Sequence, residues 1–571
     1  MLTRLVIRNF KTFADVDIEL GDRVVFVGPN NSGKTSALQA LALWNAGVRR
    51  WVEKRGAAEV SKERSGVTIN RRDLIALPIP SSNLLWRNLH VREGVKIGDK
   101  AGTRNILIDI EVEGMARGEP WKTCMEFDYA NEESFYCRSK VGDDGVRAAV
   151  PSAAAGVKLA FLPPMSGLAS NETVLTEGAI AVRIGEGRTA EVLRNLCWQA
   201  FQIGDKSPWA TIKGHMHDLF GIALADPVHV PERGELTMEF RSGGIDLDLS
   251  ASGRGQQQML LLLAHMAANP GSVLLLDEPD AHLEILRQRQ MYDVLAAMAT
   301  KTGSQIIAAS HSEVLLNEAA DRDIVVAFVG KPHRIDDRGT QVVKALKEIG
   351  FDQYLQAEQT GWVLYLEGST DLAILRAFAE TLGHPVKRHL DRPFVHYVSD
   401  QPPAAKSHFH GLREAKPDLV GIAVFDRLPS PLASDPYLQQ AMWRRNEIEN
   451  YLTTRDVLVG YARDFAARES GTPLFAESTA VRMEAAIDDV AGALEKLGKA
   501  DPFGPDLKVS TEFLDPVFKT FFRSICLPEA TMRKTDYHML ARFVSLEAIS
   551  QDVVEMLDRI QEVAERAIPR T

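Results

Sequence analysis

A glycine-rich loop follows an apolar run near the start of the chain. Residues 28–35, GPNNSGKT, match the pattern G-x-x-x-x-G-K-[ST], in which backbone N–H groups surround a β-phosphate at the positive end of the following helix. In that arrangement Lys34 contacts the β- and γ-phosphates, and the Thr35 hydroxyl holds Mg²⁺. A chance turn is the alternative, but the strand expected at 24–27 and the helix expected after it favour an ATP-binding loop. The other expected loop contributors are Gly28, Asn30, Asn31, Ser32 and Gly33.

Three further candidate residues for the ATP site follow two apolar runs far downstream in the sequence. Residues 273–276 lead into Asp277 and Glu278, and the run QIIAAS ends just before His311. If both runs are buried parallel strands, Asp277 reaches the metal ion, Glu278 activates the water that attacks the γ-phosphate, and His311 senses that phosphate. A histidine alone is more often a capping or core residue, but its place after the Asp–Glu pair favours the functional interpretation.

The segment SASGRGQQQ places Ser252, Gly253 and Gly255 in a turn before an apolar helix. In chain order, the phosphate loop, this turn, the DEP motif and the histidine resemble the ABC-type ATPases of the SMC and Rad50 group. More narrowly, they resemble the overcoming-lysogenisation-defect (OLD) family. The resemblance implies that the turn completes the ATP site of a second subunit across a head-to-tail dimer, and that Asp280 and His282 lie in the dimer-contact loop. The turn here reads SGRGQQ in place of LSGGQ.

A second set of carboxylates stands at the ends of later apolar runs. Glu367 and Asp371 follow WVLYL, and Asp426 ends the run LVGIAVFD. Strand and helix patterns alternate from 361 to about 430, which predicts a βαβαβ unit with a parallel sheet. Because the carboxyl ends of such strands share one edge, we expect these acids to converge, and converging carboxylates need a divalent cation such as Mg²⁺ or Mn²⁺.

The pattern E-G-x-x-D followed by a strand ending in Asp resembles the Toprim domain of topoisomerases, primases and OLD nucleases. The resemblance implies a metal-dependent attack on a phosphodiester by Glu367, Asp371 and Asp426. The later segment RRNEIENYLTT resembles the acidic segment that follows the Toprim-like core in anti-phage effectors, and would supply Glu447 and Glu449. Near the end of the chain, MRKTDYHML would bring Lys534 to the scissile phosphate.

The sequence departs from the Toprim pattern at one point, because D-x-D is replaced by Asp426, Arg427 and Leu428. Three interpretations stay open: the second metal ligand is Glu447 or Glu449, the site holds one metal, or it is inactive. A structural alternative also exists for Glu367 and Asp371, since acids at a helix N-terminus stabilise it by about 0.3–1 kcal/mol each.

These residues must be positioned by an α/β fold in several parts. The expected fold is an ABC-type P-loop ATPase head with a β/helical insertion, followed by a smaller Toprim-like parallel-sheet domain. We expect the head at 1–55 and 235–335, and an insertion of antiparallel strands and helices for dimerisation or sensing at 56–234. A linker at 336–360 and a Toprim-like domain with a helical C-terminal extension at 361–571 complete the assignment.

Bulk properties restrict the class of protein. The chain of 571 residues is too long for one core, and its 45% hydrophobic and 25% charged residues are those of a globular protein. Four scattered cysteines without a CxxC pair argue against a disulfide framework or a zinc site and favour a reducing, cytoplasmic environment. The net charge of −11 neither supports nor excludes a nucleic-acid enzyme, since carboxylates hold metals. No apolar run is long enough for a membrane span.

Three hypotheses follow. The first is an ATP-gated, metal-dependent nuclease that acts on DNA or tRNA, assembles through its ATPase heads as a homodimer or larger oligomer, and acts in anti-phage defence like its relatives in the Gabija and PARIS systems. The second keeps the ATPase but gives it a degenerate Toprim-like domain that binds or releases a partner effector protein. The third is a Rad50-like repair ATPase, against which the absence of long heptad repeats argues.

Overall fold

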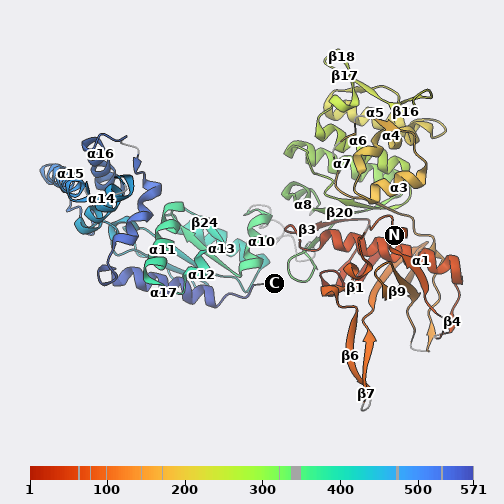
Figure 1. Ribbon diagram of the computed structural model, residues 1–571, viewed down its shortest axis with the longest axis horizontal. Coiled ribbons are helices and arrows are strands. Elements are labelled where there is room, and N and C mark those ends of the chain that lie inside the picture. Colours follow the sequence, from red (N-terminus) through yellow and green to blue (C-terminus); the bar gives the residue numbers. More distant parts are fainter. Residues whose placement is uncertain are drawn as a thin grey trace. The chain divides into compact units, whose positions relative to one another are not determined.

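The computed structural model describes residues 1–61, 63, 65–77, 79–97, 100–142, 145–166, 168–169, 171–319, 322–335, 349–470, 475–528 and 531–569. The chain divides into two compact units, Met1–Val343 and Lys344–Thr571, each built around its own parallel sheet (Figure 1). Of the linker expected at 336–360, residues 336–348 lie outside the described part. Its later half is the helix α10 (Phe351–Thr360).

The central sheet of the first unit has the order β12-β19-β20-β3-β21-β22. Its first five strands are parallel, and the short β22 is antiparallel. Almost every side chain of these five strands is buried, which explains why they read as continuous apolar runs. The order places the carboxyl end of β3 beside that of β20, and β20 beside β19. The bounds are β3 (Arg23–Val27), β12 (Leu159–Leu162), β19 (Val273–Asp277), β20 (Gln305–Ser310), β21 (Ile324–Ala327) and β22 (His333–Arg334).

An antiparallel sheet of order β2-β1-β8-β9-β10-β5 lies on the other side of helix α1 (Lys34–Arg55), which contacts strands of both sheets. At Gly47 the helix passes so close to this sheet that a Cβ atom would lie 2.8 Å from the Phe127 ring. The bounds are β1 (Leu2–Phe10), β2 (Phe13–Glu19), β5 (Val67–Asn70), β8 (Ile108–Ala116), β9 (Glu119–Asn131) and β10 (Ser134–Ser139).

The segment 56–234, expected as an insertion, is paired with the rest of the unit through this sheet and the central one. The antiparallel strands predicted there do form, but β8 pairs with β1 and β12 pairs with β19, so the segment completes both sheets of the head. A boundary at residue 56 therefore does not separate two bodies. Sequence periodicity indicates where strands lie, but strand pairing across long separations depends on the packing of α1 between the sheets.

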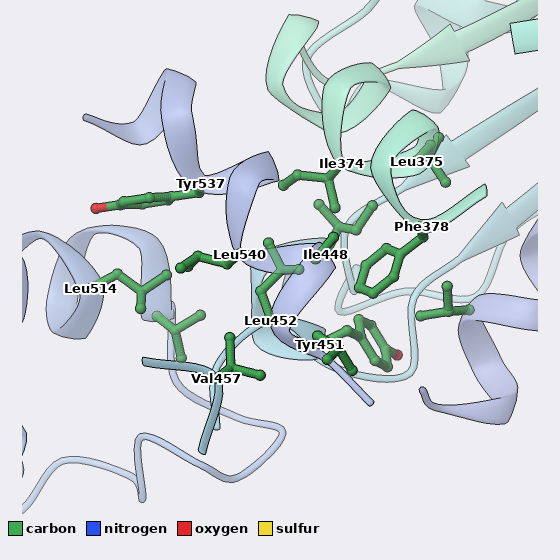
Figure 2. Close-up of a cluster of buried hydrophobic side chains, with 14 of the residues drawn as sticks. Ile374, Leu375, Phe378, Ile448, Tyr451, Leu452, Val457, Leu514, Tyr537 and Leu540 are labelled. Carbon is green, nitrogen blue, oxygen red and sulfur yellow. The ribbon is translucent and has the colours of Figure 1, made fainter. Parts of the chain in front are cut away.

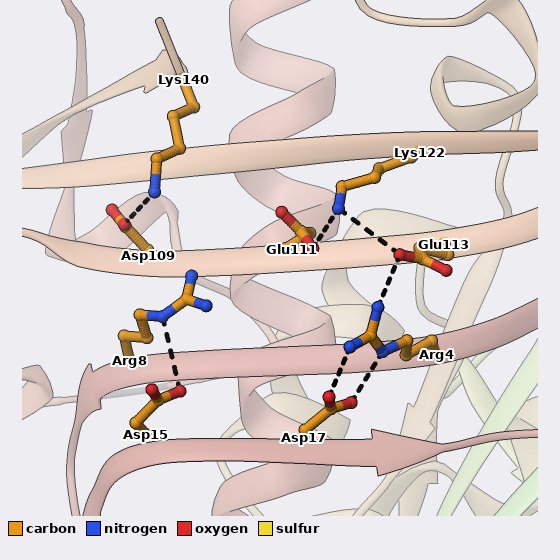
Figure 3. A network of polar contacts seen from close by, with 9 residues as sticks. All are labelled: Arg4, Arg8, Asp15, Asp17, Asp109, Glu111, Glu113, Lys122 and Lys140. Carbon is orange, nitrogen blue, oxygen red and sulfur yellow. Dashed lines mark hydrogen bonds and ion pairs between the residues drawn. The ribbon is translucent and has the colours of Figure 1, made fainter. Parts of the chain in front are cut away.

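The outer face of the antiparallel sheet carries a ladder of opposite charges (Figure 3). In β8 the residues alternate, so that Ile108, Ile110 and Val112 face the core while acids face outward. These acids and their neighbours pair across strands, which favours the observed register. Each such half-exposed pair adds only about 0–1 kcal/mol. The pairs are Arg4 with Asp17 and Glu113, Arg8 with Asp15, Lys122 with Glu111 and Glu113, and Lys140 with Asp109.

The rest of the first unit is mainly helical. Helix α6 packs against α4, α5 and α7, and two small three-stranded sheets, β13-β16-β15 and β14-β17-β18, flank these helices. The helices are α2 (Ser152–Ala155), α3 (Glu177–Gly185), α4 (Leu193–Gln202), α5 (Ser207–Phe220), α6 (Arg254–Ala268), α7 (Ile285–Thr302) and α8 (Glu313–Ala319). The strands are β4 (Val60–Ser61), β6 (Arg92–Ile97), β7 (Lys100–Asn105), β11 (Val146–Arg147), β13 (Glu172–Thr173), β14 (Ala223–Leu224), β15 (Val228–Val230), β16 (Glu235–Thr237), β17 (Glu239–Ser242) and β18 (Ile245–Asp248).

His265, in the last turn of α6, is buried beside a cavity of about 790 Å³ between α1, α3, α4 and β12. Its ring lies near the Ala160 backbone, but within the described residues neither ring nitrogen makes a hydrogen bond of normal geometry. Burial lowers the pKa of His265 from 6.5 to about 4, so the folded state holds it neutral. The free energy of unfolding should therefore not depend on this titration above pH 6.5. As the pH falls from 6.5 towards 4, it should decrease by about 3 kcal/mol in total.

A His265→Leu variant should accordingly be more stable than the parent chain, and the difference should grow from pH 7.5 to pH 5. The substitution removes a buried polar group without a partner and the need to keep it uncharged. Scanning calorimetry at both pH values measures the effect, with His217→Leu on the exposed face of α5 as the control. An equal loss of melting temperature in parent and variant would contradict the assignment of this pH dependence to His265.

The second unit contains the parallel sheet β24-β23-β25-β26, in agreement with the βαβαβ pattern expected from 361 onward. Helices α10, α11, α13 and α17 pack around it. The strands are β23 (Trp362–Leu366), β24 (Val395–Tyr397), β25 (Val420–Phe425) and β26 (Leu438–Met442). The helices are α11 (Ser369–Leu382), α12 (Lys387–Leu390), α13 (Pro402–Ala415), α14 (Arg455–Ser470), α15 (Ala476–Lys496), α16 (Asp515–Ser524) and α17 (Gln551–Glu565). Across the described residues, no helix is long and apolar enough to cross a bilayer.

One hydrophobic cluster joins the sheet to the C-terminal helices (Figure 2). It packs Phe378 of α11 against Leu452, which follows the 3-10 turn η7 (Ile448–Tyr451), and against Leu540 of the 3-10 segment η11 (Lys534–Phe543). The three elements come from distant parts of the chain, and burial of their apolar faces stabilises their contact. The polar ends of these same elements are thereby held near one another.

Candidate functional site

The phosphate loop follows β3 directly, and Gly28 and Gly33 take positive φ values of 157° and 102°. A Cβ atom at Gly33 would lie 2.8 Å from the Phe13 ring, so the turn requires glycine. Lys34 Nζ donates hydrogen bonds to the carbonyl oxygens of Gly28 (2.7 Å) and Pro29 (2.8 Å), which keeps the ammonium group inside the loop. Burial lowers the pKa of Lys34.

Ser32 supports a phosphate as the ligand of this loop. Its hydroxyl group is buried and has no hydrogen-bond partner in the part of the chain that the structure describes. Buried polar groups are nearly always paired, so an unpaired hydroxyl in a glycine-rich loop at a helix N-terminus fits a ligand with oxygen acceptors. Asn30 and Asn31 lie in the same loop, where Asn31 has a φ of 64°.

The pairing of β3, β20 and β19 brings the catalytic candidates of the first unit together. Thr35 Oγ1 lies 3.0 and 2.9 Å from the two carboxylate oxygens of Asp277, where a shared Mg²⁺ ion would be held. Burial raises the pKa of Asp277 to about 6. The next residue, Glu278, has a φ of 49°, and its Oε1 lies 3.7 Å from Nδ1 of His311. A strained residue at this position is typical of a functional site.

The glycine-rich turn at 252–255 packs against the segment after the DEP motif of its own chain. The Ser252 hydroxyl donates to the Leu249 carbonyl oxygen (2.6 Å), and Gly253 forms the N-cap of α6. A Cβ atom at Gly255 would lie 3.0 Å from the carbonyl oxygen of His282. Burial raises the pKa of Asp280, whose Oδ1 has no hydrogen-bond partner in the described part of the chain. The turn therefore presents its polar groups beside the loop expected to meet a second subunit.

In the second unit, three acids stand at the carboxyl ends of three neighbouring parallel strands. Glu367 follows β23, Asp426 follows β25, and Asp400 follows β24 two residues after Val398. One carboxylate oxygen from each lies within 4.8 Å of the other two. Burial and the adjacent Glu367 carboxyl raise the pKa of Asp426, and burial and Glu367 also raise the pKa of Asp400. The group is an oxygen donor set suited to Mg²⁺ or Mn²⁺.

The other predicted residues surround this group in different roles. Asp371 Oδ2 accepts hydrogen bonds from the backbone N–H groups of Glu367 (3.1 Å) and Gly368 (3.2 Å), so it caps α11. Burial and the nearby Glu449 raise the pKa of Asp371 to about 6. The structural alternative of a helix cap is therefore realised for Asp371, while its charge still acts on the acidic group.

A second set of charged side chains lies beside the three acids and consists of Glu447, Glu449 and Lys534. Both Glu447 oxygens accept hydrogen bonds from Ser510, one from the backbone N–H (2.5 Å) and one from the hydroxyl (2.9 Å). Lys534 Nζ lies 3.4 Å from Glu449 Oε1. Burial lowers the pKa of Lys534, but Glu449, Glu447 and Glu367 raise it above its usual value. The hydrophobic cluster of Figure 2 holds the elements that carry these groups.

Comparison with known proteins bears mainly on the first unit. Residues 1–70 match the model of an AAA ATPase domain, and residues 192–317 match that of an AAA domain described as a putative AbiEii toxin of a type IV toxin–antitoxin system. These two segments of the first unit are therefore similar to AAA ATPase domains. ATPases of this kind bind ATP with Mg²⁺, and the loop at 28–35, Asp277 and Glu278 all lie within the matched segments.

Three further similarities involve one protein sequence and two solved structures. A segment of 43 residues is 46% identical to an OLD nuclease of Thermus scotoductus and covers 8% of this chain and 8% of that protein. Among solved structures, the SMC head domain from Thermotoga maritima is 16% identical with a TM-score of 0.29, over 58% of this chain and 98% of that chain. An Smc head domain with an extended coiled coil, bound to the C-terminal domain of ScpA and derived from Pyrococcus furiosus, is 14% identical with a TM-score of 0.35. That match covers 61% of this chain and 99% of the other.

Asp400 is the site residue that the sequence analysis missed. It was overlooked because β24 is short and only half-buried, although an acid shortly after a strand of a parallel sheet was the signal used for Glu367 and Asp426. Asp400 also accepts a hydrogen bond from the backbone N–H of Asp426 (3.1 Å). Of the two residues expected as a second metal ligand, Glu447 accepts hydrogen bonds from Ser510 with both oxygens, and Glu449 forms an ion pair with Lys534. Asp400, in contrast, lies in the three-acid group.

Proposed function

We propose that the chain is an ATP-controlled, metal-dependent nuclease in which a Toprim-like second unit cleaves DNA or RNA. The observation that carries the proposal is the group formed by Glu367, Asp400 and Asp426 at the ends of three adjacent parallel strands. Converging carboxylates of this kind repel one another without a cation. The Lys534 ammonium group beside them supplies a positive charge suited to a phosphate.

Each residue has a stated role in this proposal. Glu367, Asp400 and Asp426 would hold Mg²⁺ or Mn²⁺, which lowers the pKa of a bound water so that it can attack a phosphodiester. Lys534 would neutralise charge on the scissile phosphate. Asp371 fixes the turn that carries Glu367, and Glu449 orients Lys534. Glu447 ties this second set of charged side chains to Ser510.

The ATPase unit would act as the controller. In the dimer that we propose, Ser252, Gly253 and Gly255 of one subunit close over the ATP held by residues 28–35 of the other, and Asp280 and His282 line the contact. His311 would report the state of the γ-phosphate through Glu278, 3.7 Å away. ATP binding and hydrolysis would change the separation of the heads and thereby access to the nuclease.

A role in bacterial anti-phage defence is part of the proposal. It is supported by the 43-residue similarity to an OLD nuclease and by the AAA model described as part of a toxin–antitoxin system. A kinship with the Gabija and PARIS systems, and a second protein of the same defence system as partner, belong to the same proposal. The expected location of such an enzyme is the cytoplasm, where its nucleic-acid substrates and ATP are found.

The purified chain should cleave supercoiled plasmid DNA or total tRNA with MgCl₂ or MnCl₂, and it should not cleave either in EDTA. Gel assays with and without ATP identify the substrate and show whether ATP activates or restrains the cleavage. Calorimetric titration with MnCl₂ in the absence of nucleotide measures metal binding independently of any missing trigger. Absence of both cleavage and Mn²⁺ binding would rule out the nuclease.

A second candidate is a catalytically degenerate domain that binds a partner effector. It is favoured by Leu428, which replaces the second acid of D-x-D, and by the Arg427 side chain before it, whose Nη2 pairs with Asp506 Oδ1 at 2.9 Å rather than with the three acids. In this case the chain would hydrolyse ATP but show neither Mn²⁺ binding at the three acids nor cleavage. A third, Rad50-like repair role would show ATP hydrolysis that responds to DNA ends and is unaffected by changes at Glu367.

A further inference from the structure

Residues 503–510 of the second unit form a segment that we call the strap. Hydrogen bonds and one ion pair hold it beside the acidic group, which is formed by Glu367, Asp400 and Asp426. It is bound by residues 444–450, which follow β26, and by Arg427. Its apolar members Leu507 and Val509 are buried in the unit's core. The hydrogen bonds are Asn446 N to Pro505 O (2.8 Å), Asn446 Nδ2 to Asp506 O (3.0 Å), Asn450 Nδ2 to Leu507 O (3.1 Å), Arg445 Nη1 to Phe503 O (3.3 Å), and Ser510 N and Oγ to Glu447 (2.5 and 2.9 Å).

Arg427 has a clear function in this arrangement. Its backbone N–H donates to the Asn446 carbonyl oxygen (2.9 Å), and its guanidinium group pairs with Asp506 (2.9 Å). It directly follows Asp426 of the acidic group. Arg427, at the middle position of the D-x-D pattern, therefore attaches the strap to the same loop that carries a candidate metal ligand.

The strap presents a single lysine to solvent. Leu507 and Val509 point into the core, so Lys508 between them points outward and is exposed. Within the described residues, its ammonium group makes no ion pair or hydrogen bond. By contrast, Lys499, shortly before the strap, pairs with Glu512 at 2.8 Å. A lysine on a rigid segment without a fixed partner is available for an external anion.

Lys508 and Lys534 reach the neighbourhood of the three acids on two different segments, the strap and η11. Hydrogen bonds and an ion pair connect the strap to the acids: Asp506 pairs with Arg427, which follows Asp426, and the backbone N–H of Asp426 donates to Asp400. In agreement with this placement, the charge of Lys508 partly offsets the rise in the pKa of Asp400 caused by burial and Glu367. Lys534 instead pairs with Glu449, in the turn after β26. Two lysines from separate segments therefore lie near the three acids.

We propose that Lys508 binds a backbone phosphate of the nucleic-acid strand, next to the phosphate held at the three acids. This inference rests on the proposed nuclease function. A single phosphate ester needs only the metal site and Lys534, whereas a second lysine on a separate segment beside the acids suits a polymer with phosphates at regular intervals. The substrate class is thus a continuous strand engaged through its backbone, without selection of bases by Lys508.

The test is the salt dependence of cleavage by Lys508→Ala, with Lys499→Ala as the matched control. Each phosphate contact adds roughly 0.7–0.9 to the slope of log(kcat/KM) against log[salt]. We expect Lys508→Ala to lose one such increment, so that between 50 and 200 mM KCl its kcat/KM falls about threefold less than that of the parent chain. The loss should appear in KM with kcat nearly unchanged, and Lys499→Ala should keep the full slope.

A purely structural or charge-balancing role for Lys508 gives a different result. If Lys508 only neutralises Asp400, its removal tightens Mn²⁺ binding and leaves the salt slope unchanged, and this outcome overturns the proposal. A thermal unfolding curve that matches that of the parent chain verifies that the variant is folded.

Binding separates failure of this inference from failure of the nuclease proposal. Fluorescence anisotropy of a labelled 30-nucleotide strand with CaCl₂ in place of Mg²⁺ gives the same salt slope without cleavage. A slope that depends on Lys508 in a chain that neither cleaves nor binds Mn²⁺ supports the strand contact and rejects the nuclease. Absence of binding, or a slope that is the same in Lys508→Ala, rejects the contact.

Discussion

A chain carrying Glu278→Gln should still bind ATP but hydrolyse it at least a hundredfold more slowly, about the loss expected when a general base is removed. Glutamine keeps the shape of the side chain but does not accept the proton of the attacking water. Asp277 and Thr35, which would hold the metal, are untouched. Phosphate release measures turnover, and retention of a fluorescent ATP analogue measures binding.

The same variant tests the proposed dimer. Because hydrolysis opens ATP-bound heads in the proposed cycle, Glu278→Gln should shift the chain towards a larger species in the presence of ATP, detected by light scattering. Glu284→Gln, on an exposed residue before α7, is the control and should behave as the parent chain. Turnover of Glu278→Gln within tenfold of the parent rate would show that another group activates the water.

Asp426→Asn should abolish metal-dependent cleavage, by at least a thousandfold, and leave ATP hydrolysis unchanged. Without metal, burial and the Glu367 carboxyl raise the pKa of Asp426, so the folded chain favours its protonated form. Asparagine imitates that neutral form, and the fold should therefore be kept or slightly stabilised. The amide supplies no negative charge for the cation, so the enthalpy of MnCl₂ binding should disappear along with cleavage.

Controls for this second prediction are available in the same unit. Asp391→Asn, on an exposed acid after α12, should change neither Mn²⁺ binding nor cleavage. Asp400→Asn should weaken both, which distinguishes the three-acid group from the ligand set expected from Glu447 and Glu449. Cleavage that survives in Asp426→Asn, with Mn²⁺ still bound, would show that the metal lies elsewhere.

The sequence by itself determined the parts of this protein whose chemistry depends on contiguous residues. The phosphate loop needs a strand, two glycines with positive φ, and Lys34 and Thr35 at a helix N-terminus, and all of these are written in one short segment. The runs that end at Asp277, Glu367 and Asp426 were also readable, because parallel strands buried on both faces are nearly all apolar. From them the α/β class and two separate parallel sheets follow.

Only the tertiary structure decided which residues share a site. Glu447 and Ser510 are 63 residues apart, and their hydrogen bond removes Glu447 from the expected ligand set. Asp400 joins the acids because β24 pairs with β23, although its strand is too short and too exposed to stand out in the sequence. Likewise, the strands at 67–139 belong to the same unit as the phosphate loop because α1 packs between two sheets. Local sequence encodes the type of each element, but side-chain partners across long separations follow from the burial of apolar faces, which is not local.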